Sequence, residues 1–120
     1  MKIYCPYCGK PARWVENKEI YGRNYGKSYM CWLCKDCDAY VGCHQNTKEP
    51  LGTVANRELR KWRKEAHSVF DLLWKKYDYK RKESYILLQT MMGLSPKKAH
   101  IGKFNIEQCK KLIKKINESN

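Results

Sequence analysis

Apolar side chains recur at three- and four-residue spacing through much of the second half of the chain. The longest series predicts an amphipathic helix over residues 56–77, with Asn56 as its N-cap. A shorter series predicts a helix over residues 84–92 that ends at Gly93. The apolar positions of the first helix are Leu59, Trp62, Ala66, Val69, Phe70, Leu73, Trp74 and Tyr77.

A short turn and a last helix are predicted further along the chain. Ser95-Pro96 is expected to open the turn, because serine caps a helical turn and proline fits its first position. Asn105 and Gln108 have the spacing of a capping box, which predicts that the last helix begins there. The stripe expected to be buried in this helix comprises Ile106, Cys109, Leu112, Ile113 and Ile116.

The first half of the chain contains short runs that are typical of β-strands. Asn17-Lys18 is expected to be the turn of a hairpin, and residues 22–27 would form a loop rich in glycine and asparagine. The polar stretch 45–56, which contains a proline and a glycine, is expected to be a linker. Strands are predicted over residues 2–4, 12–16, 19–21, 29–33 and 39–42.

Two Cys-x-x-Cys pairs are the most specific motif in the chain. They are Cys5-Pro-Tyr-Cys8 and Cys34-Lys-Asp-Cys37. Four thiolates suit the tetrahedral preference of Zn²⁺, and the two-residue gap lets a tight turn direct both sulfurs at one ion. Gly9 suits the strained backbone expected just after the first pair. Because four thiolates leave no open position for a water molecule, we expect one zinc ion with a structural role.

Cys31 is a rival ligand, since Cys31-Trp-Leu-Cys34 is also a Cys-x-x-Cys pair. We favour the pairing of Cys34 with Cys37, because the residues that follow Cys37 fit a turn. Cys31 fits a strand instead, in which its side chain would alternate with that of Trp32. A pair formed by Cys31 and Cys34 is the alternative.

These patterns together predict an α+β protein. Residues 1–44 would form a zinc ribbon of β-hairpins, in which the metal substitutes for a large core. Residues 45–56 would link this ribbon to a basic helical region at 57–120, a small unit of about three helices packed with the ribbon.

Basic residues dominate the charge of the chain. The 25 Lys and Arg outnumber the 12 Asp and Glu, which gives a net charge of +13. Residues 1–50 carry eight of these cations and five of the acids, a net of +3, and residues 51–120 carry seventeen and seven, a net of +10. An excess of this size indicates a polyanionic partner, of which DNA or RNA is the first candidate.

The cysteine pattern also bears on the cellular compartment. An odd number of cysteines, arranged in Cys-x-x-Cys pairs, favours free or metal-bound thiols over disulfides. Met1 leads directly into the first predicted strand, so we expect no signal peptide. No run approaches the roughly 18 apolar residues of a membrane helix. We therefore expect a cytoplasmic protein with no membrane partner.

Two basic surfaces are candidates for contact with nucleic acid. The first lies near the N-terminus of the helix predicted at 56–77, where the helix dipole also favours an anion. The second is the loop that carries Arg23, Lys27 and Tyr25, a basic and aromatic mixture typical of surfaces that stack single-stranded bases. The tyrosine is alternatively an ordinary strand residue. The cations of the first surface are Arg57, Arg60, Lys61 and Lys64.

Several metal-ligating or reactive side chains follow the second cysteine pair. Structural packing, a second metal site and Cys/His nucleophilic catalysis are all open interpretations of this set. His67 and Asp71 are four residues apart, so the carboxylate could orient the imidazole. Packing is favoured, because Cys109 falls on an apolar stripe. The set comprises Cys43, His44, His67, Asp71, His100 and Cys109.

Motifs along nearly the whole chain resemble one known family. They are Cys5-Pro-Tyr-Cys8-Gly9, Tyr21-Gly22-Arg23, the run from Cys34 to His44, Pro50-Leu-Gly-Thr53, Glu65-Ala-His67 with Phe70-Asp71, and His100-Ile-Gly102 with Phe104, Gln108 and Cys109. In this order they resemble a small family of zinc-finger-containing proteins of unknown function, found in bacteriophages and bacterial genomes. The resemblance implies a phage or prophage origin and a zinc ribbon fused to helices, and it implies no particular activity. Cys31 departs from the family pattern.

The favoured interpretation is a small zinc-binding phage or prophage protein that binds nucleic acid, DNA or RNA, in the cytoplasm of a bacterial host cell. A first alternative is an interaction module that binds and modulates a host protein, such as a polymerase or a defence complex. A second alternative is a Cys/His-dependent enzyme. The enzyme is the least favoured of the three, because nothing in the sequence defines a substrate pocket or a nuclease motif.

Overall fold

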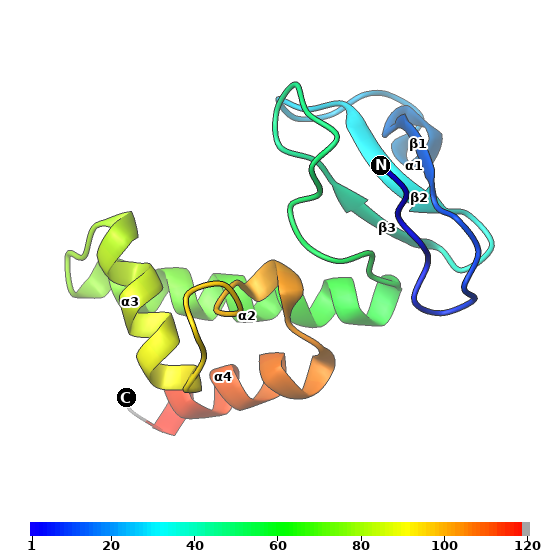
Figure 1. Cartoon of the computed structure of the whole chain (residues 1–120). Helices are drawn as coiled ribbons and strands as arrows, with labels where there is room; N and C mark the ends of the chain where they lie inside the picture. The colour runs from blue at the N-terminus through cyan, green and yellow to red at the C-terminus, as the bar shows by residue number, and fades with distance from the viewer. Residues whose placement is uncertain (119–120) are drawn as a thin grey trace. The chain divides into compact units, whose positions relative to one another are not determined.

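The chain runs from a three-stranded antiparallel sheet into a set of helices, which confirms the predicted α+β class (Figure 1). The structure is a computed structural model and describes residues 1–118. The strands are β1 (Arg13–Glu16), β2 (Met30–Cys34) and β3 (Ala39–Gly42). The helices are α1 (Lys18–Tyr21), α2 (Arg57–Lys76), α3 (Arg81–Met92), the 3-10 turn η1 (Ile101–Lys103) and α4 (Ile106–Glu118).

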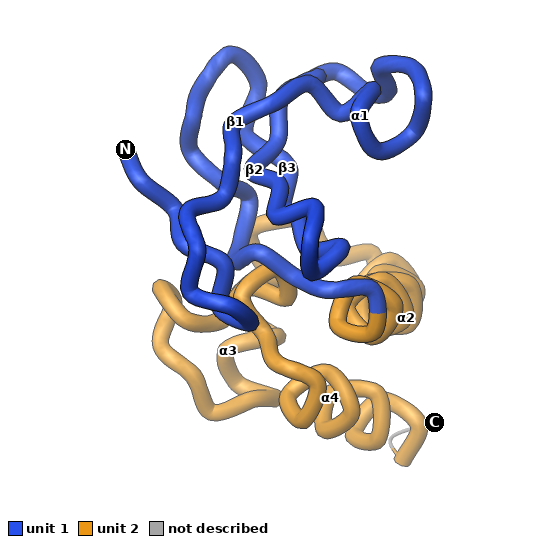
Figure 2. The backbone as a smooth tube through the Cα atoms, turned by 90° about the vertical axis from the view of Figure 1, so that its right-hand side faces the viewer, with its two compact units in different colours: residues 1–57 blue, residues 58–120 orange. Residues whose placement is uncertain are grey.

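The chain divides into two units, which are coloured separately in Figure 2. The first, Met1–Arg57, contains the sheet and is called the sheet unit below. The second begins at Glu58, contains most of the helical residues and is called the helical unit. Each unit has a core of its own buried side chains.

Strand β2 lies between β1 and β3, so its residues have partners on both sides. Trp32 pairs with Trp14 on β1 and with Val41 on β3. Side chains alternate between the two faces of a strand, so Trp32 and Cys34 face one side and Cys31 faces the other. The first side forms the core of the sheet unit, which comprises Cys5, Ala12, Trp32, Cys34, Ala39, Cys43 and Val54.

The strand predicted at residues 19–21 is wrong, because the chain forms the single helical turn α1 there. The carbonyl of Asn17 accepts hydrogen bonds from the N–H groups of Ile20 and Tyr21, at 3.0 and 3.1 Å. Gly22 ends this turn with a φ of 83°, a left-handed conformation that glycine adopts without strain. The partner of β1 is therefore β2, and the loop after α1 connects the two strands.

The N-terminal segment is a narrow hairpin rather than a regular strand. The strand predicted at residues 2–4 is reduced to one bridge, between Tyr4 and Pro11. The N–H of Cys5 donates to the carbonyl of Lys10 at 2.8 Å, which closes the loop between them. The first cysteine pair therefore lies in a tightly closed loop.

The stretch interpreted as a linker, residues 45–56, lies within the sheet unit. Tyr40 on β3 and Ala55 exchange two backbone hydrogen bonds of 3.0 and 3.1 Å. The N–H of Leu51 donates to the carbonyl of Gly42 at 2.9 Å. This stretch therefore extends the sheet beside β3.

The helical unit is built from α2, α3 and α4 around an apolar core. The helix predicted at 56–77 corresponds to α2 to within one residue at each end. The predicted capping box of α4 is present, with hydrogen bonds of 2.9 and 2.8 Å between Asn105 and Gln108. The core comprises Ala66, Phe70, Leu73, Leu88, Met92, Ala99, Ile101, Phe104, Cys109, Leu112 and Ile116.

Helix α3 begins three residues earlier than predicted. The N–H of Lys80 donates to the side chain of Glu83 at 3.1 Å, and the N–H of Ser84 donates to the carbonyl of Lys80 at 3.0 Å. Glu83 therefore acts as the acidic half of a capping box, although lysine is not a usual N-cap residue. Ser84, which was expected to start the helix, is buried inside it.

The side chain of Arg63 on α2 is buried in the helical unit, whereas its neighbours Lys61 and Lys64 are exposed. Its side chain is only 9% exposed. Its Nε donates a hydrogen bond of 2.9 Å to the carbonyl of Phe104. This contact ties α2 to the segment just before α4, because Phe104 is itself fully buried.

Candidate functional site

Both Cys-x-x-Cys pairs lie in turns of the sheet unit, and each turn is followed by a residue with a left-handed backbone. The N–H of Gly9 donates to the carbonyl of Cys5 at 2.9 Å, and Gly9 has a φ of 77°. In the second turn the N–H of Asp38 donates to the carbonyl of Lys35 at 3.2 Å, and Asp38 has a φ of 50°. A left-handed residue directly after each second cysteine therefore turns the chain back at both places.

These turns bring the four predicted ligands together. The Sγ atoms of Cys5, Cys8, Cys34 and Cys37 all lie within 4.8 Å of one another. The Sγ atoms of Cys8 and Cys34 are 3.7 Å apart. A tetrahedral zinc ion with Zn–S bonds of about 2.3 Å separates its sulfurs by about 3.8 Å. The donor set and its spacing thus fit one Zn²⁺ and leave no ligand position for a reacting water, which is the chemistry of a structural site.

The thiols of this cluster influence one another's protonation. Burial would raise the pKa of the Cys5 thiol, but hydrogen bonds from the Tyr7 and Cys8 backbone and from neighbouring thiols lower it to about 7. Burial raises the pKa of Cys37 to about 12, and hydrogen bonds with the other three cysteines add to this effect. The Cys5 thiol therefore ionises more easily than that of Cys37, and zinc must displace the proton of Cys37 when it binds.

Cys31 lies outside the cluster, as the favoured assignment requires. It occupies β2 three residues before Cys34, so the alternation of side chains places the two on opposite faces of the sheet. Burial raises the pKa of the Cys31 thiol to about 11, and repulsion from Cys43 adds to the shift. Cys31 is therefore a neutral buried thiol at pH 7, and the pairing with Cys34 is not formed.

The model of one protein family, described as a zinc-finger-containing domain, matches residues 1–119. The chain belongs to this zinc-finger-containing domain family. The prediction of one structural zinc ion is confirmed, because the family and the cysteine cluster agree. Comparisons with curated proteins and with solved structures found no match. The family is thus defined by its zinc finger, and no activity is assigned to it.

The cations predicted to bind nucleic acid occupy the start of α2 in this zinc-finger-containing domain. Arg57, Lys61 and Lys64 are exposed, whereas Arg60 is half-buried. Arg57, Lys61 and Lys64 lie four and three residues apart, which places them on one side of the helix. The exposed part of the basic surface is called the α2 cation row below and consists of Arg57, Lys61 and Lys64.

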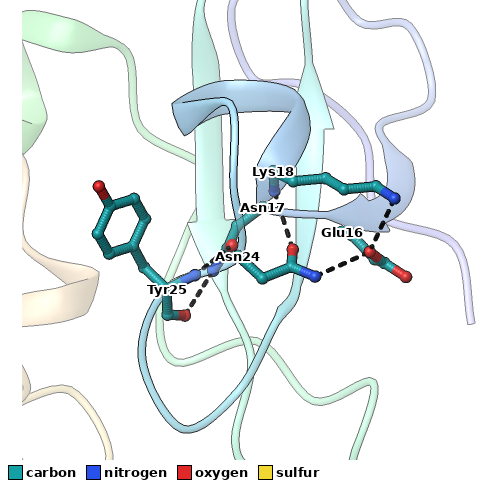
Figure 3. A network of polar contacts seen from close by, with 5 residues as sticks. All are labelled: Glu16, Asn17, Lys18, Asn24 and Tyr25. Carbon is teal, nitrogen blue, oxygen red and sulfur yellow. Dashed lines mark hydrogen bonds and ion pairs between the residues drawn. The ribbon is translucent and has the colours of Figure 1, made fainter.

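The second predicted surface is the loop between α1 and β2, which Asn17 holds in shape (Figure 3). The side-chain amide of Asn17 donates to the carbonyl of Tyr25 at 2.9 Å and accepts from its N–H at 3.0 Å. The guanidinium of Arg23 lies 4.7 Å from the centroid of the Tyr25 ring. Its Nε also donates to the Tyr25 hydroxyl at 2.8 Å. The structure thus brings together Arg23 and Tyr25 of the three predicted loop residues.

Asn24 fixes the same loop from its other side (Figure 3). Its side-chain amide donates to Glu16 at 2.9 Å, and its side-chain oxygen accepts from the N–H of Lys18 at 3.1 Å. The Lys18 ammonium lies 3.4 Å from the Glu16 carboxylate. The hydrogen bond from Asn24 and the charge of Lys18 lower the pKa of Glu16. Hydrogen bonds of Glu16, Asn17 and Asn24 therefore fix the conformation of the loop. The Tyr25 ring points away from this network (Figure 3).

The remaining Cys/His set is divided between the two units. Cys43 and His44 belong to the sheet unit and line a pocket there, at the end of β3. The Cys43 thiol is 3.9 Å from the Lys48 carbonyl, and burial raises its pKa. His44 is exposed. Within residues 1–118 the four clustered cysteines are the sole group with the geometry to hold a metal ion, so these two residues form no second metal centre.

The other four members of the set lie in the helical unit and have separate roles. Cys109 is fully buried in the core, as its position on the apolar stripe predicted. The Asp71 carboxylate accepts a hydrogen bond of 3.0 Å from Trp74 Nε1. The His100 ring lies 5.5 Å from the ring of Tyr85. Partial desolvation lowers the pKa of His67, although the charge of Asp71 opposes this shift.

Sequence reasoning missed Tyr40 and Gln45, which line the same pocket as His44 and Lys27. Tyr40 lies on β3 two residues before Gly42, so strand alternation alone could have placed both on one face. Gln45 follows the strand and had no distinguishing pattern. No helix described over residues 1–118 is both long and apolar enough to span a bilayer.

Proposed function

We propose that this zinc-finger-containing protein binds nucleic acid through the α2 cation row, while zinc maintains the fold of the sheet unit. The row itself carries the proposal. Arg57, Lys61 and Lys64 are exposed, and within residues 1–118 no acidic side chain forms an ion pair with any of them. A phosphate backbone would supply the negative charges that these three cations lack within the described part of the protein.

The position of the row on α2 supports an external anion. Like charges at three- and four-residue spacing repel one another. Cations near a helix N-terminus also oppose the helix dipole. The surrounding sequence adds to the same field, since residues 51–120 carry a net charge of +10. Bound phosphates would offset both the repulsion between the cations and their unfavourable interaction with the helix dipole. The row is therefore more stable with a bound polyanion than exposed to solvent.

The loop of the sheet unit supports a second contribution to binding. Arg23 is held against Tyr25, and Lys27 is exposed two residues further on. A fixed guanidinium beside an aromatic ring suits contact with a phosphate and an unstacked base. Asn17 supports the backbone of the loop, and the contact with Tyr25 orders Arg23 before a ligand arrives.

The test compares two variants that remove equal charge from the chain. Arg57→Ala, Lys61→Ala and Lys64→Ala together remove the α2 cation row. Fluorescence anisotropy with single-stranded and duplex oligonucleotides should show weaker binding, and the slope of log K against log salt should fall by about 2–3.

A matched control removes three lysines of α4, near the C-terminal end of that helix, where the dipole favours cations. We expect this variant to keep most of the wild-type salt dependence. Equal losses in the two variants, or no loss in the first, would contradict the role of α2. The control substitutions are Lys111→Ala, Lys114→Ala and Lys115→Ala.

A protein partner is a second candidate, favoured by exposed apolar side chains in the helical unit. Leu72 is 72% exposed and Ile86 is 55% exposed. A pull-down from bacterial lysate after nuclease treatment distinguishes the two functions, because a stoichiometric protein retained without nucleic acid favours the second. With either function we also propose a phage or prophage source, which the family resemblance supports, and the cytoplasm of a bacterial host, which the cysteine pattern supports.

A further inference from the structure

The sheet unit contains a pocket of about 410 Å³ that the α2 cation row does not explain. Volumes of about 300–1,000 Å³ are typical of sites for small ligands and cofactors. Met30, Cys31 and Leu51 supply apolar lining, and Gly42 adds bare backbone between them. The pocket therefore offers a surface against which a flat apolar group can pack.

Two tyrosines form an aromatic wall of this pocket. The ring of Tyr21 meets the ring of Tyr40 edge-on, with centroids 6.3 Å apart, and their hydroxyls are 3.2 Å apart. Tyr21 also meets Tyr25 edge-on at 5.4 Å. These contacts fix the orientation of the Tyr21 ring although 48% of the residue is exposed. The wall is thus preformed and accessible.

Three polar side chains of the pocket are available to a ligand, and the lining carries no carboxylate. The side chains of Lys27, His44 and Gln45 line it, and none has a hydrogen bond or ion pair within residues 1–118. Neither aspartate nor glutamate is among the lining residues. Asn17, in contrast, is fully occupied in holding the loop (Figure 3). A cation, an imidazole and an amide therefore converge on one space with no partner inside the protein.

We propose that this pocket binds one nucleotide, with its base against the tyrosine wall and apolar lining and its phosphate on Lys27. His44 and Gln45 offer hydrogen bonds to the edge of the base. The base must be unpaired, because pairing in a duplex covers the edge and stacking covers the faces. The nucleotide comes either from a single strand or from the free pool. The first source rests on the function proposed above and makes the pocket the site that selects single strands.

The pocket is tested with the full-length zinc-loaded protein and two probes. The first is a single-stranded oligonucleotide with 2-aminopurine at its centre, together with its duplex. The second is adenosine monophosphate alone, followed by ¹H–¹⁵N NMR. We expect the single strand to bind at least about tenfold more tightly than the duplex and the 2-aminopurine fluorescence to be quenched by stacking. The monophosphate should shift the amide signals of residues 40–45.

The variant Lys27→Ala with Gln45→Ala removes two groups that have no partner in the fold, so its structure should be unchanged. It should lose about tenfold in single-strand affinity while its duplex affinity changes little. Lys2→Ala with Lys27 and Gln45 intact is the charge-matched control, because Lys2 is exposed in the same unit and does not line the pocket. The control should retain the quenching and the NMR shifts.

The outcomes separate this proposal from the role of α2. Oligonucleotide binding that depends on α2 but is equal for single strand and duplex, with no quenching and no shifts at residues 40–45, overturns the pocket and leaves the α2 proposal standing. Shifts at residues 40–45 with the monophosphate, without binding of any oligonucleotide, support a pocket for free nucleotides and overturn the nucleic-acid function. No response to either probe overturns both.

Discussion

The sulfur atoms of Cys8 and Cys34 lie 3.7 Å apart although 26 positions separate the two residues in the chain. The sheet alone does not require this proximity, because Cys8 belongs to no strand. A shared metal ion explains it, since the ion closes a long loop and compensates for the lost chain entropy. The metal therefore joins the first Cys-x-x-Cys turn to the end of β2, in addition to the apolar contacts of Cys5 in the core.

Removal of zinc should unfold the sheet unit and leave the helical unit folded. The core of the sheet unit is small and includes two of the ligands, Cys5 and Cys34. The helical unit has a separate core without any of the four ligands. After treatment with a strong chelator, ¹H–¹⁵N NMR should show collapsed dispersion for residues 1–57 and native positions for most of residues 58–118.

Restoring zinc should recover the sheet-unit spectrum, which serves as the control for irreversible damage. If the spectrum of residues 1–57 kept its dispersion after complete metal loss, zinc would not be structural. If both units collapsed together, the two cores would not be independent.

At both residues that follow the Cys-x-x-Cys pairs, Gly9 and Asp38, glycine should give a more stable protein than alanine. Gly9 has a φ of 77°, and a Cβ added there would meet no atom within 4 Å. Gly9→Ala should therefore cost about 1–2 kcal/mol through backbone strain alone. Asp38, with a φ of 50°, already bears that strain, so Asp38→Gly should be more stable than Asp38→Ala, which loses the same carboxylate and keeps the strain. Urea denaturation of the zinc-loaded proteins measures these differences, and an Asp38→Gly variant no more stable than Asp38→Ala would contradict backbone strain at this position.

Arg63 should matter for stability and its neighbour Lys64 should not. Arg63→Ala removes a buried side chain that donates to the Phe104 carbonyl at 2.9 Å. The expected loss is about 2–3 kcal/mol, because a hydrogen bond from a charged group is removed and its buried acceptor is left unsatisfied. Lys64→Ala, at an exposed position, should stay within about 0.5 kcal/mol of the wild type. Equal midpoints for the two variants in thermal unfolding would show that the Arg63 contact adds nothing.

Much of the fold could be predicted because its determinants are local. The three- and four-residue period of α2 and the Asn105 to Gln108 capping box depend on nearby residues and appear in the structure. The turn α1 could not be predicted, because residues 19–21 suit a strand by composition. The side chain of Asn17 decides between the two, since it reaches eight residues along the chain to bind the backbone of Tyr25.

In the candidate site, too, the features that depend on nearby residues could be predicted and those that depend on distant residues could not. The metal ligands could be identified from spacing, since a turn brings each Cys-x-x-Cys pair together by itself. The burial of Arg63 could not be predicted, because nothing near it in sequence reveals the Phe104 carbonyl 41 positions away. The pocket was likewise hidden, as His44 and Lys27 meet only through the arrangement of β2, β3 and the loop.

The loop network makes the protonation of Glu16 a further test. The hydrogen bond from Asn24, with the charge and hydrogen bond of Lys18, lowers the pKa of Glu16 below its ordinary value of 4.5. Because the folded-state pKa is depressed, the stabilisation by this carboxylate is complete above about pH 4.5 and is lost as the pH falls through the lower, folded-state pKa. NMR titration with excess zinc should show that Asn24→Ala moves the pKa of Glu16 upward. An unchanged titration would mean that the Asn24 contact does not form.

Native mass spectrometry of the wild type and two cysteine variants tests most directly that Cys5, Cys8, Cys34 and Cys37 hold one structural zinc ion. We predict one zinc per chain in the wild type and in Cys31→Ser, because Cys31 lies outside the cluster. Cys37→Ser should lose the ion or bind it only weakly. Retention of zinc by Cys37→Ser together with its loss from Cys31→Ser would contradict the assignment.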